Sequence, residues 1–115
     1  MKRLFFCILC CFGITSLNWT FSVVQAASEE IYVITLQDHR FSPAELIIPS
    51  NKKVKIMVEN RDSTAEEFES YSLNREKMIT GKGTIILYIG PLKPGSYKYF
   101  GEFHQSTAQG IITTK

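Results

Sequence analysis

Hydrophobic and polar positions alternate along much of the chain with the period of a β-strand. Residues 53–60 give the clearest example. Val54, Ile56 and Val58 share one face, whereas the positions between them are mainly charged, with Met57 as the exception. Because successive side chains of a strand point to opposite faces, this segment is predicted to be a strand with one buried and one wet face.

Short strands separated by turn residues are predicted over the rest of the chain. β-Branched and aromatic residues favour strands, and clusters of Gly, Pro, Asn and Asp end them. The predicted strands are 31–36, 45–48, 53–60, 66–71, 84–89, 96–100 and 111–114. Residues 38–43 are expected to interrupt the pattern, because Pro43 lacks an amide donor, and residues 71–77 also fit one helical turn. The pattern indicates an all-β fold, an antiparallel sandwich with Greek-key connections.

The first 26 residues have the features of a secretory signal peptide. Lys2 and Arg3 form a short basic start, an apolar stretch follows, and small residues end it at Ala26. Polar residues interrupt the stretch, so it offers no clean membrane span of about 20 residues. We therefore expect residues 1–26 to be removed and residues 27–115 to form one periplasmic domain, peripheral to the membrane at most.

Removing this leader also changes the cysteine count and the charge of the chain. All three cysteines lie within it, so the remaining domain has neither a disulfide nor a thiolate ligand. The chain carries 13 Lys and Arg against 11 Asp and Glu, and without Lys2 and Arg3 the two counts are equal. A domain without net charge gives no electrostatic reason to expect nucleic acid or an anionic membrane as a partner.

Two histidines remain after the leader, and both lie beside predicted turns. His39 follows the first strand, and His104 precedes the last one. Loops that follow alternate strands of a sandwich gather at one end, so His39, the acidic segment 66–69 and the loop 102–104 are expected to meet. Imidazole together with carboxylate suits Cu(II), Fe, Mn or Zn. The alternative is that both histidines are solvated surface residues.

The last third of the chain follows the order used by cupredoxins. A Pro-Gly turn, an aromatic strand, a short loop with a potential ligand and a Gly-led final strand occur in succession. In a blue copper protein this loop carries a cysteine, then a histidine, then a methionine. Here Glu102 stands near the place of the cysteine, His104 follows, and Ala108 replaces the methionine. The frame resembles that of a copper protein without its sulfur ligands.

From residue 34 to the end, the chain resembles the cupredoxin-like proteins encoded with bacterial high-affinity iron permeases. The matching phrases are DHRFSPAE at 38–45, EEFES at 66–70, LNREK at 73–77, IGPLKPG at 89–95, FGEFH at 100–104 and TAQG at 107–110. The resemblance implies a cupredoxin-like domain that handles iron in the periplasm, with a bound copper or iron ion. It also implies a metal site of Glu67, Glu102 and His104, with His39 as a fourth ligand and Glu69 as an alternate.

Alternation along residues 66–70 divides the acidic side chains between two faces. Glu67 and Glu69 point the same way, and Glu66 points to the opposite face, where we expect solvent. A site of nitrogen and oxygen ligands favours the higher oxidation state of copper or iron and lacks the intense colour of a blue site. Met57 and Met78 are expected to pack rather than to bind Cu(I).

The preferred interpretation is an accessory metal-binding protein that assists iron uptake. It would bind copper or iron and help to oxidise ferrous iron or to deliver it to an iron permease or another periplasmic uptake component. No nucleophile with its base, phosphate loop or pair of hydrolytic acids is visible, so a free-standing enzyme is not expected. Two alternatives stay open: a copper protein for electron transfer or copper tolerance, and a metal-free sandwich used for protein–protein contact.

Overall fold

The computed structural model describes residues 18–23 and 30–115. Most of the predicted signal peptide and its cleavage point lie outside the described residues. Residues 18–23 are exposed and form neither helix nor strand. Within the described ranges, no helix has the length and apolar character needed to cross a membrane.

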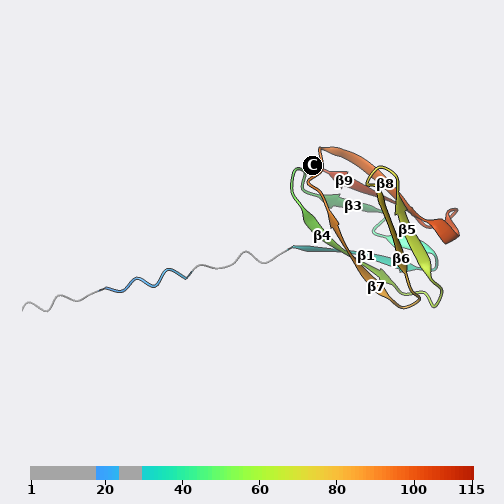
Figure 1. Ribbon diagram of the computed structural model, residues 1–115, viewed down its shortest axis with the longest axis horizontal. Helices are drawn as coiled ribbons and strands as arrows, with labels where there is room; N and C mark the ends of the chain where they lie inside the picture. The colour runs from blue at the N-terminus through green and yellow to red at the C-terminus, as the bar shows by residue number, and fades with distance from the viewer. Residues whose placement is uncertain (1–17, 24–29) are drawn as a thin grey trace, which may run out of the picture.

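Residues 30–115 form nine strands and one turn of 3-10 helix (Figure 1). The elements are β1 (Ile31–Gln37), β2 (Arg40–Ser42), β3 (Glu45–Ile48), β4 (Val54–Asn60), β5 (Glu66–Ser70), β6 (Arg75–Ile79), β7 (Thr84–Ile89), β8 (Gly95–Gly101), η1 (Glu102–His104) and β9 (Gln109–Thr114). The predicted bounds of β3 and β7 are confirmed at both ends.

The strands form two sheets, in the orders β2-β1-β4-β7 and β3-β9-β8-β5-β6. The all-β sandwich is therefore confirmed. The prediction of purely antiparallel pairing is wrong, because β1 pairs with β4, and β3 with β9, in parallel. Alternation of polarity reports which face of a strand is buried, and it carries no information about the direction of the neighbouring strand.

The inner faces of the two sheets share one apolar core. Val54, Ile56 and Val58 are buried in it, as their spacing predicts. At its centre, the ring of Tyr99 stacks on Phe68 with 4.9 Å between centroids. Burial raises the pKa of Tyr99, and its hydroxyl group has no hydrogen-bond partner among the described residues.

The ring of Tyr99 also accounts for the need for glycine at position 110 in the neighbouring strand β9. Tyr99 of β8 lies opposite Gly110 of β9 in the sheet register. A Cβ atom at Gly110 would overlap the Tyr99 ring. This position therefore needs a residue without a side chain so that the ring can lie across the strand.

Two strands were not predicted. Residues 38–43 do not break the sheet, because only the turn at 38–39 is irregular and β2 pairs antiparallel with β1. Residues 71–77, which the sequence left ambiguous, form no helical turn: a turn over 71–74 leads into β6, which pairs with β5. β6 is an edge strand with exposed residues from 75 to 78, so it lacks the alternation that reveals a half-buried strand.

Candidate metal centre

Three segments that are far apart in the sequence meet at the end of the sandwich away from the C-terminus (Figure 1). The β1–β2 turn carries His39, β5 begins at Glu66, and η1 carries His104 directly after β8. Phe68 of β5 pairs with Gly101 of β8, which brings the start of β5 beside η1. The structure thus gathers the segments that carry the predicted ligands.

The two histidines are in direct contact. The rings of His39 and His104 are stacked, with 3.5 Å between their centroids and 12° between their planes. Their side chains are 39% and 29% exposed, respectively. Two independent solvated histidines, the alternative left open by the sequence, do not describe this geometry.

Asp62 in the β4–β5 connection holds His39 in place. Asp38 and His39 form the β1–β2 turn with φ angles of 52° and 56°, in the left-handed region. The Asp62 carboxylate accepts hydrogen bonds from the backbone N–H groups of Asp38 (2.8 Å) and His39 (3.0 Å). It also lies 3.5 Å from Nδ1 of His39. Burial alone would raise the pKa of Asp62, but these donors and the charges of His39 and Lys82 hold it below its ordinary value.

Glu66 is the functional candidate that the sequence reasoning misplaced. It is only 1% exposed, so the expectation that it faces solvent is wrong. Its Oε1 accepts hydrogen bonds from the backbone N–H groups of Glu67 (3.0 Å) and Phe103 (2.8 Å). Its Oε2 lies 2.6 Å from Nδ1 of His104. These donors offset the cost of burying a carboxyl group.

The sequence did contain the pattern that reveals this burial. Glu66, Phe68 and Ser70 share one face of β5, and all three are buried. Since Phe68 must face the core, strict alternation places Glu66 on the core side as well. A buried carboxyl group in turn requires a donor, and one of the two remaining histidines is the natural candidate.

Gly101, and not Glu102, is the residue of this loop that faces the interior. A Cβ atom at Gly101 would lie 2.6 Å from Cδ of Glu66 and 2.8 Å from Cβ of Ala108. Glu102 is exposed. Glu102 therefore does not take the inward position of this loop, and metal binding by Glu102 stays a prediction. Neither Gly101 nor Ala108 has a side-chain atom that could bind a metal ion.

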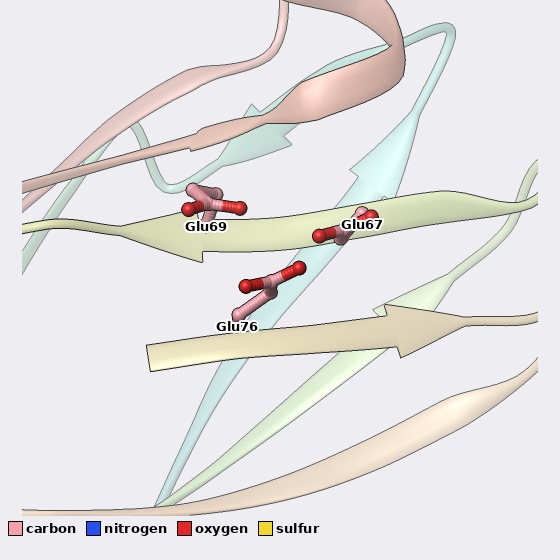
Figure 2. Close-up of side chains that lie close together, drawn as sticks. All are labelled: Glu67, Glu69 and Glu76. Atoms are coloured by element: carbon pink, nitrogen blue, oxygen red, sulfur yellow. The ribbon is translucent and has the colours of Figure 1, made fainter. Parts of the chain in front are cut away.

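The acidic side chains on the outer face of β5 form a second group. Glu67 and Glu69 of β5 and Glu76 of β6 each offer a carboxylate oxygen within 4.8 Å of the others (Figure 2). A hydrogen bond with Glu76, partial burial, and the charges of Glu76, Glu69 and Glu102 raise the pKa of Glu67 to about 7. Glu76 was not a predicted candidate, because β6 itself was not predicted.

The predicted ligands thus fall into two neighbouring groups. In the first group, the rings of His39 and His104 are stacked, and the carboxyl group of Glu66 contacts Nδ1 of His104. Glu67 and Glu69 face Glu76, and the charge of Glu102 acts on Glu67. In the described part of the chain, the acidic group is the one set of three or more His, Cys, Asp or Glu side chains compact enough to surround an ion. Metal binding by either group stays a prediction.

Comparison of the sequence with protein families gives a match over almost its whole length. Residues 7–114 match the family model of the cupredoxin-like domain. An uncharacterized protein of Rickettsia prowazekii (strain Madrid E) is 47% identical over 79 residues, which are 69% of this chain and 63% of the relative. The match therefore spans less than two thirds of the length of that relative.

Solved structures of cupredoxins superpose on the fold. Auracyanin A, a blue copper protein of Chloroflexus aurantiacus, matches with a TM-score of 0.65 and 14% identity, covering 76% of this chain and all of the other. A purple cupredoxin of Nitrosopumilus maritimus gives 0.58 and 20%, covering 73% and 99%. Amicyanin of Paracoccus versutus gives 0.59 and 15%, covering 80% and 86%. At these identities the similarity shows the fold alone.

Proposed function

Because the chain belongs to the cupredoxin-like domain family, we propose that it is an exported protein that binds copper or iron through nitrogen and oxygen ligands and assists iron uptake. The observation that carries the proposal is the contact between His39 and His104 at the end of the sandwich. Each Nδ1 of the pair lies near a carboxylate, from Asp62 and Glu66 respectively. Imidazoles arranged in this way resemble metal ligands supported by acidic neighbours.

The residues at this end decide which form of copper fits. A blue copper centre needs a thiolate and a weak axial thioether. Gly101 and Ala108 supply neither, and Glu66 occupies the space beside them. A thiolate copper centre therefore does not fit the part of the chain over residues 30–115. Copper(II) bound by imidazole and carboxylate does fit, because these ligands suit that ion.

The acidic group on β5 and β6 supports iron as a second ion. Glu67, Glu69 and Glu76 present hard anionic oxygens, and Glu102 adds a further negative charge nearby. The pKa of Glu67 is raised first by its hydrogen bond with Glu76, then by partial burial and by the like charges of Glu76, Glu69 and Glu102. A cation at this group would relieve the repulsion, and iron ions accept such ligands.

The chain's own residues have separate roles in this proposal. His39 and His104 bind copper. Glu67 binds ferrous iron, with Glu69 as an alternate ligand and Glu76 beside them, and the charge of Glu102 helps to attract it. The rigid sandwich holds these residues at one end. Copper(II), when bound, supplies a one-electron acceptor for the conversion of ferrous to ferric iron, and is itself reduced to copper(I).

The proposed location is the periplasm, and the proposed partner is an iron permease or another uptake component. The basic start, interrupted apolar stretch and small residues of segment 1–26 support export. The sequence phrases shared with proteins encoded beside iron permeases support the partner. Co-purification of a permease with the exported protein, and its loss in a double variant of His39 and His104, would test the link.

Metal analysis of the exported protein tests the binding proposal. The wild type is expected to retain copper or iron, and His104→Ala and Glu67→Gln are each expected to reduce the retained metal. Glu30→Gln is the matched control, because Glu30 is exposed and precedes β1, at the opposite end from His39. Metal content that is unchanged in both site variants would refute the proposal. The copper-loaded protein is also expected to lack an intense visible band.

Copper-dependent electron transfer or copper tolerance is the second candidate. The blue and purple copper proteins among the structures with this fold favour it. Titration of the copper-loaded protein with ferrous iron separates the two functions. Reduction of copper(II) by ferrous iron, followed by release of ferric iron, supports a role in iron uptake. Copper that ferrous iron neither reduces nor displaces supports the second candidate.

A further inference from the structure

The buried carboxyl group of Glu66 lies 2.6 Å from Nδ1 of His104. We propose that Glu66 is a positioning residue, whose carboxylate holds the Nδ1–H group of His104 and leaves Nε2 as the atom that binds the metal ion. This inference rests on the metal-binding function proposed above. It goes further by naming the ligand atom and the residue that prepares it.

The other hydrogen bonds of Glu66 show which partner carries the proton. Its Oε1 already accepts two backbone N–H groups, from Glu67 and from Phe103. Its Oε2 faces Nδ1 of His104 and no further acceptor among the described residues. Two backbone N–H donors on one oxygen stabilise the ionised carboxylate, which accepts at both of its oxygens. The proton between Glu66 and His104 therefore belongs to Nδ1.

This arrangement fixes the tautomer of His104. A neutral imidazole carries one N–H group, so a proton on Nδ1 leaves a lone pair on Nε2. The described residues provide no hydrogen-bond donor to Nε2, and the side chain is 29% exposed. Histidines that bind metals through one ring nitrogen usually donate the other N–H group to a carboxylate, a backbone carbonyl or water, which fixes the ring and raises its basicity.

The interior side of His104 offers no room for an ion. Glu66 fills the space next to Gly101, since a Cβ atom there would lie 2.6 Å from Cδ of Glu66. The buried methyl group of Ala108 closes the same space, 2.8 Å from that Cβ position. The ion therefore reaches His104 at the ring nitrogen that Glu66 does not occupy. Glu66 takes part in binding only through the histidine.

The tautomer of His104 in the metal-free exported protein is the direct test. Nitrogen NMR shifts of the ring, measured above the pH range in which histidine titrates, are expected to show the proton on Nδ1. In Glu66→Gln, the amide oxygen must take the place of Oε1 to accept from Glu67 and Phe103. Its NH2 group then faces Nδ1, so the proton is expected to move to Nε2. Glu67→Gln is the matched control and is expected to keep the wild-type tautomer.

Titration with zinc, a diamagnetic probe, tests the ligand atom. In the wild type, zinc is expected to shift the Nε2 resonance of His104 far more than the Nδ1 resonance. Binding of zinc and of copper(II) is expected to weaken about 10-fold to 100-fold in Glu66→Gln, the usual effect of losing such a partner.

Several results would overturn the inference. A proton on Nε2 of the wild type would do so without any variant, even if Glu66→Gln failed to fold. An unchanged tautomer or unchanged zinc affinity in a folded Glu66→Gln would also do so. The proposed function fails separately: copper and zinc affinities unchanged in His104→Ala would remove His104 as a ligand, whatever its tautomer.

Discussion

Glu66 and Glu67 are consecutive residues of the same type, but their side chains lie in opposite surroundings. Glu66 is buried, accepts hydrogen bonds from two backbone N–H groups, and lies 2.6 Å from Nδ1 of His104. Glu67 is half-buried on the outer face and shares a hydrogen bond with another carboxyl group, that of Glu76. The comparison teaches that the partners of an acid, more than its depth, decide whether its charge is stabilised.

Removal of the buried Glu66 carboxyl group is expected to lower the stability of the protein more than any other change in this comparison. Glu66→Leu leaves the N–H groups of Glu67 and Phe103 and Nδ1 of His104 without their acceptor in the interior. Unsatisfied buried donors are costly, so the free energy of unfolding is expected to fall by about 2–4 kcal/mol. Denaturant unfolding measures the change. Glu67→Leu is the control, and an equal loss in both variants would contradict the distinction.

Filling the space beside Glu66 is the next most severe change. Gly101→Ala places a Cβ atom 2.6 Å from Cδ of Glu66, whereas the φ angle of Gly101 is −92°, which alanine accepts. Overpacking of this kind is expected to lower stability by about 1–3 kcal/mol. Gly95→Ala on the same strand is the control, since its Cβ would make only ordinary contacts of 3.8 Å or more.

A double-mutant cycle ties that cost to Glu66. The loss of stability caused by Gly101→Ala is expected to be smaller in a Glu66→Ala background, because the carboxyl group that would overlap the new Cβ atom is absent. A cost that stays the same in both backgrounds would show that Glu66 is not the obstacle.

Loss of the Asp62 carboxylate is expected to release His39 at a smaller cost. Asp62→Ala removes the acceptor of two backbone N–H groups in a turn with positive φ angles. Stability is expected to fall by about 1–2 kcal/mol, and NMR contacts between the rings of His39 and His104 are expected to weaken. Asp38→Asn, which keeps a residue tolerant of positive φ, is the control. Intact ring contacts in Asp62→Ala would refute this role.

The contribution of Asp62 has a defined pH dependence. Its pKa in the folded protein is below the ordinary value of 3.8. The unfolded chain therefore binds the proton more readily, so the stabilisation is present above the ordinary pKa and is lost as the pH falls through the folded value.

The smallest expected effect concerns the outer acids and has the opposite sign. The pKa of Glu67 is raised from 4.5 to about 7, chiefly by its hydrogen bond with Glu76. Its contribution to stability is therefore full below the ordinary pKa and is lost as the pH rises through about 7. Glu76→Gln is expected to return the pKa of Glu67 toward 4.5 in a carboxyl NMR titration, whereas Glu30→Gln leaves it unchanged. A pKa that stays near 7 without the Glu76 carboxylate would assign the shift to burial and to the charges of Glu69 and Glu102.

The sequence was sufficient to predict most strands, because burial on one face imposes alternation. Residues 54–60 show this directly, whereas residues 84–89 were recognisable as a short apolar run. β6 lies at a sheet edge with both faces largely exposed, so no alternation marks it, and Glu76 could not be placed beside Glu67. The parallel pairs depend on how distant segments assemble, which local patterns do not encode.

The sequence predicted several residues of the candidate site, but it did not predict which of them contact one another. His39 and His104 were identified from their positions beside turns, and the structure stacks them. The contact between Glu66 and His104 spans 38 residues of sequence, and no local rule selects it. The alternation of Glu66 with Phe68 would have shown which way the acid points, although not what it meets.

Main-chain hydrogen bonds join the two ends of the His104 loop. The Gly101 N–H group donates to the Ala108 carbonyl oxygen (2.9 Å), and the Ala108 N–H group donates to the His104 carbonyl oxygen (2.8 Å). Both bonds join backbone atoms, and β8 and β9 keep their register below them. The exposed side chains of Glu102 and Ser106 can therefore be exchanged to alter ion preference while the sandwich stays intact.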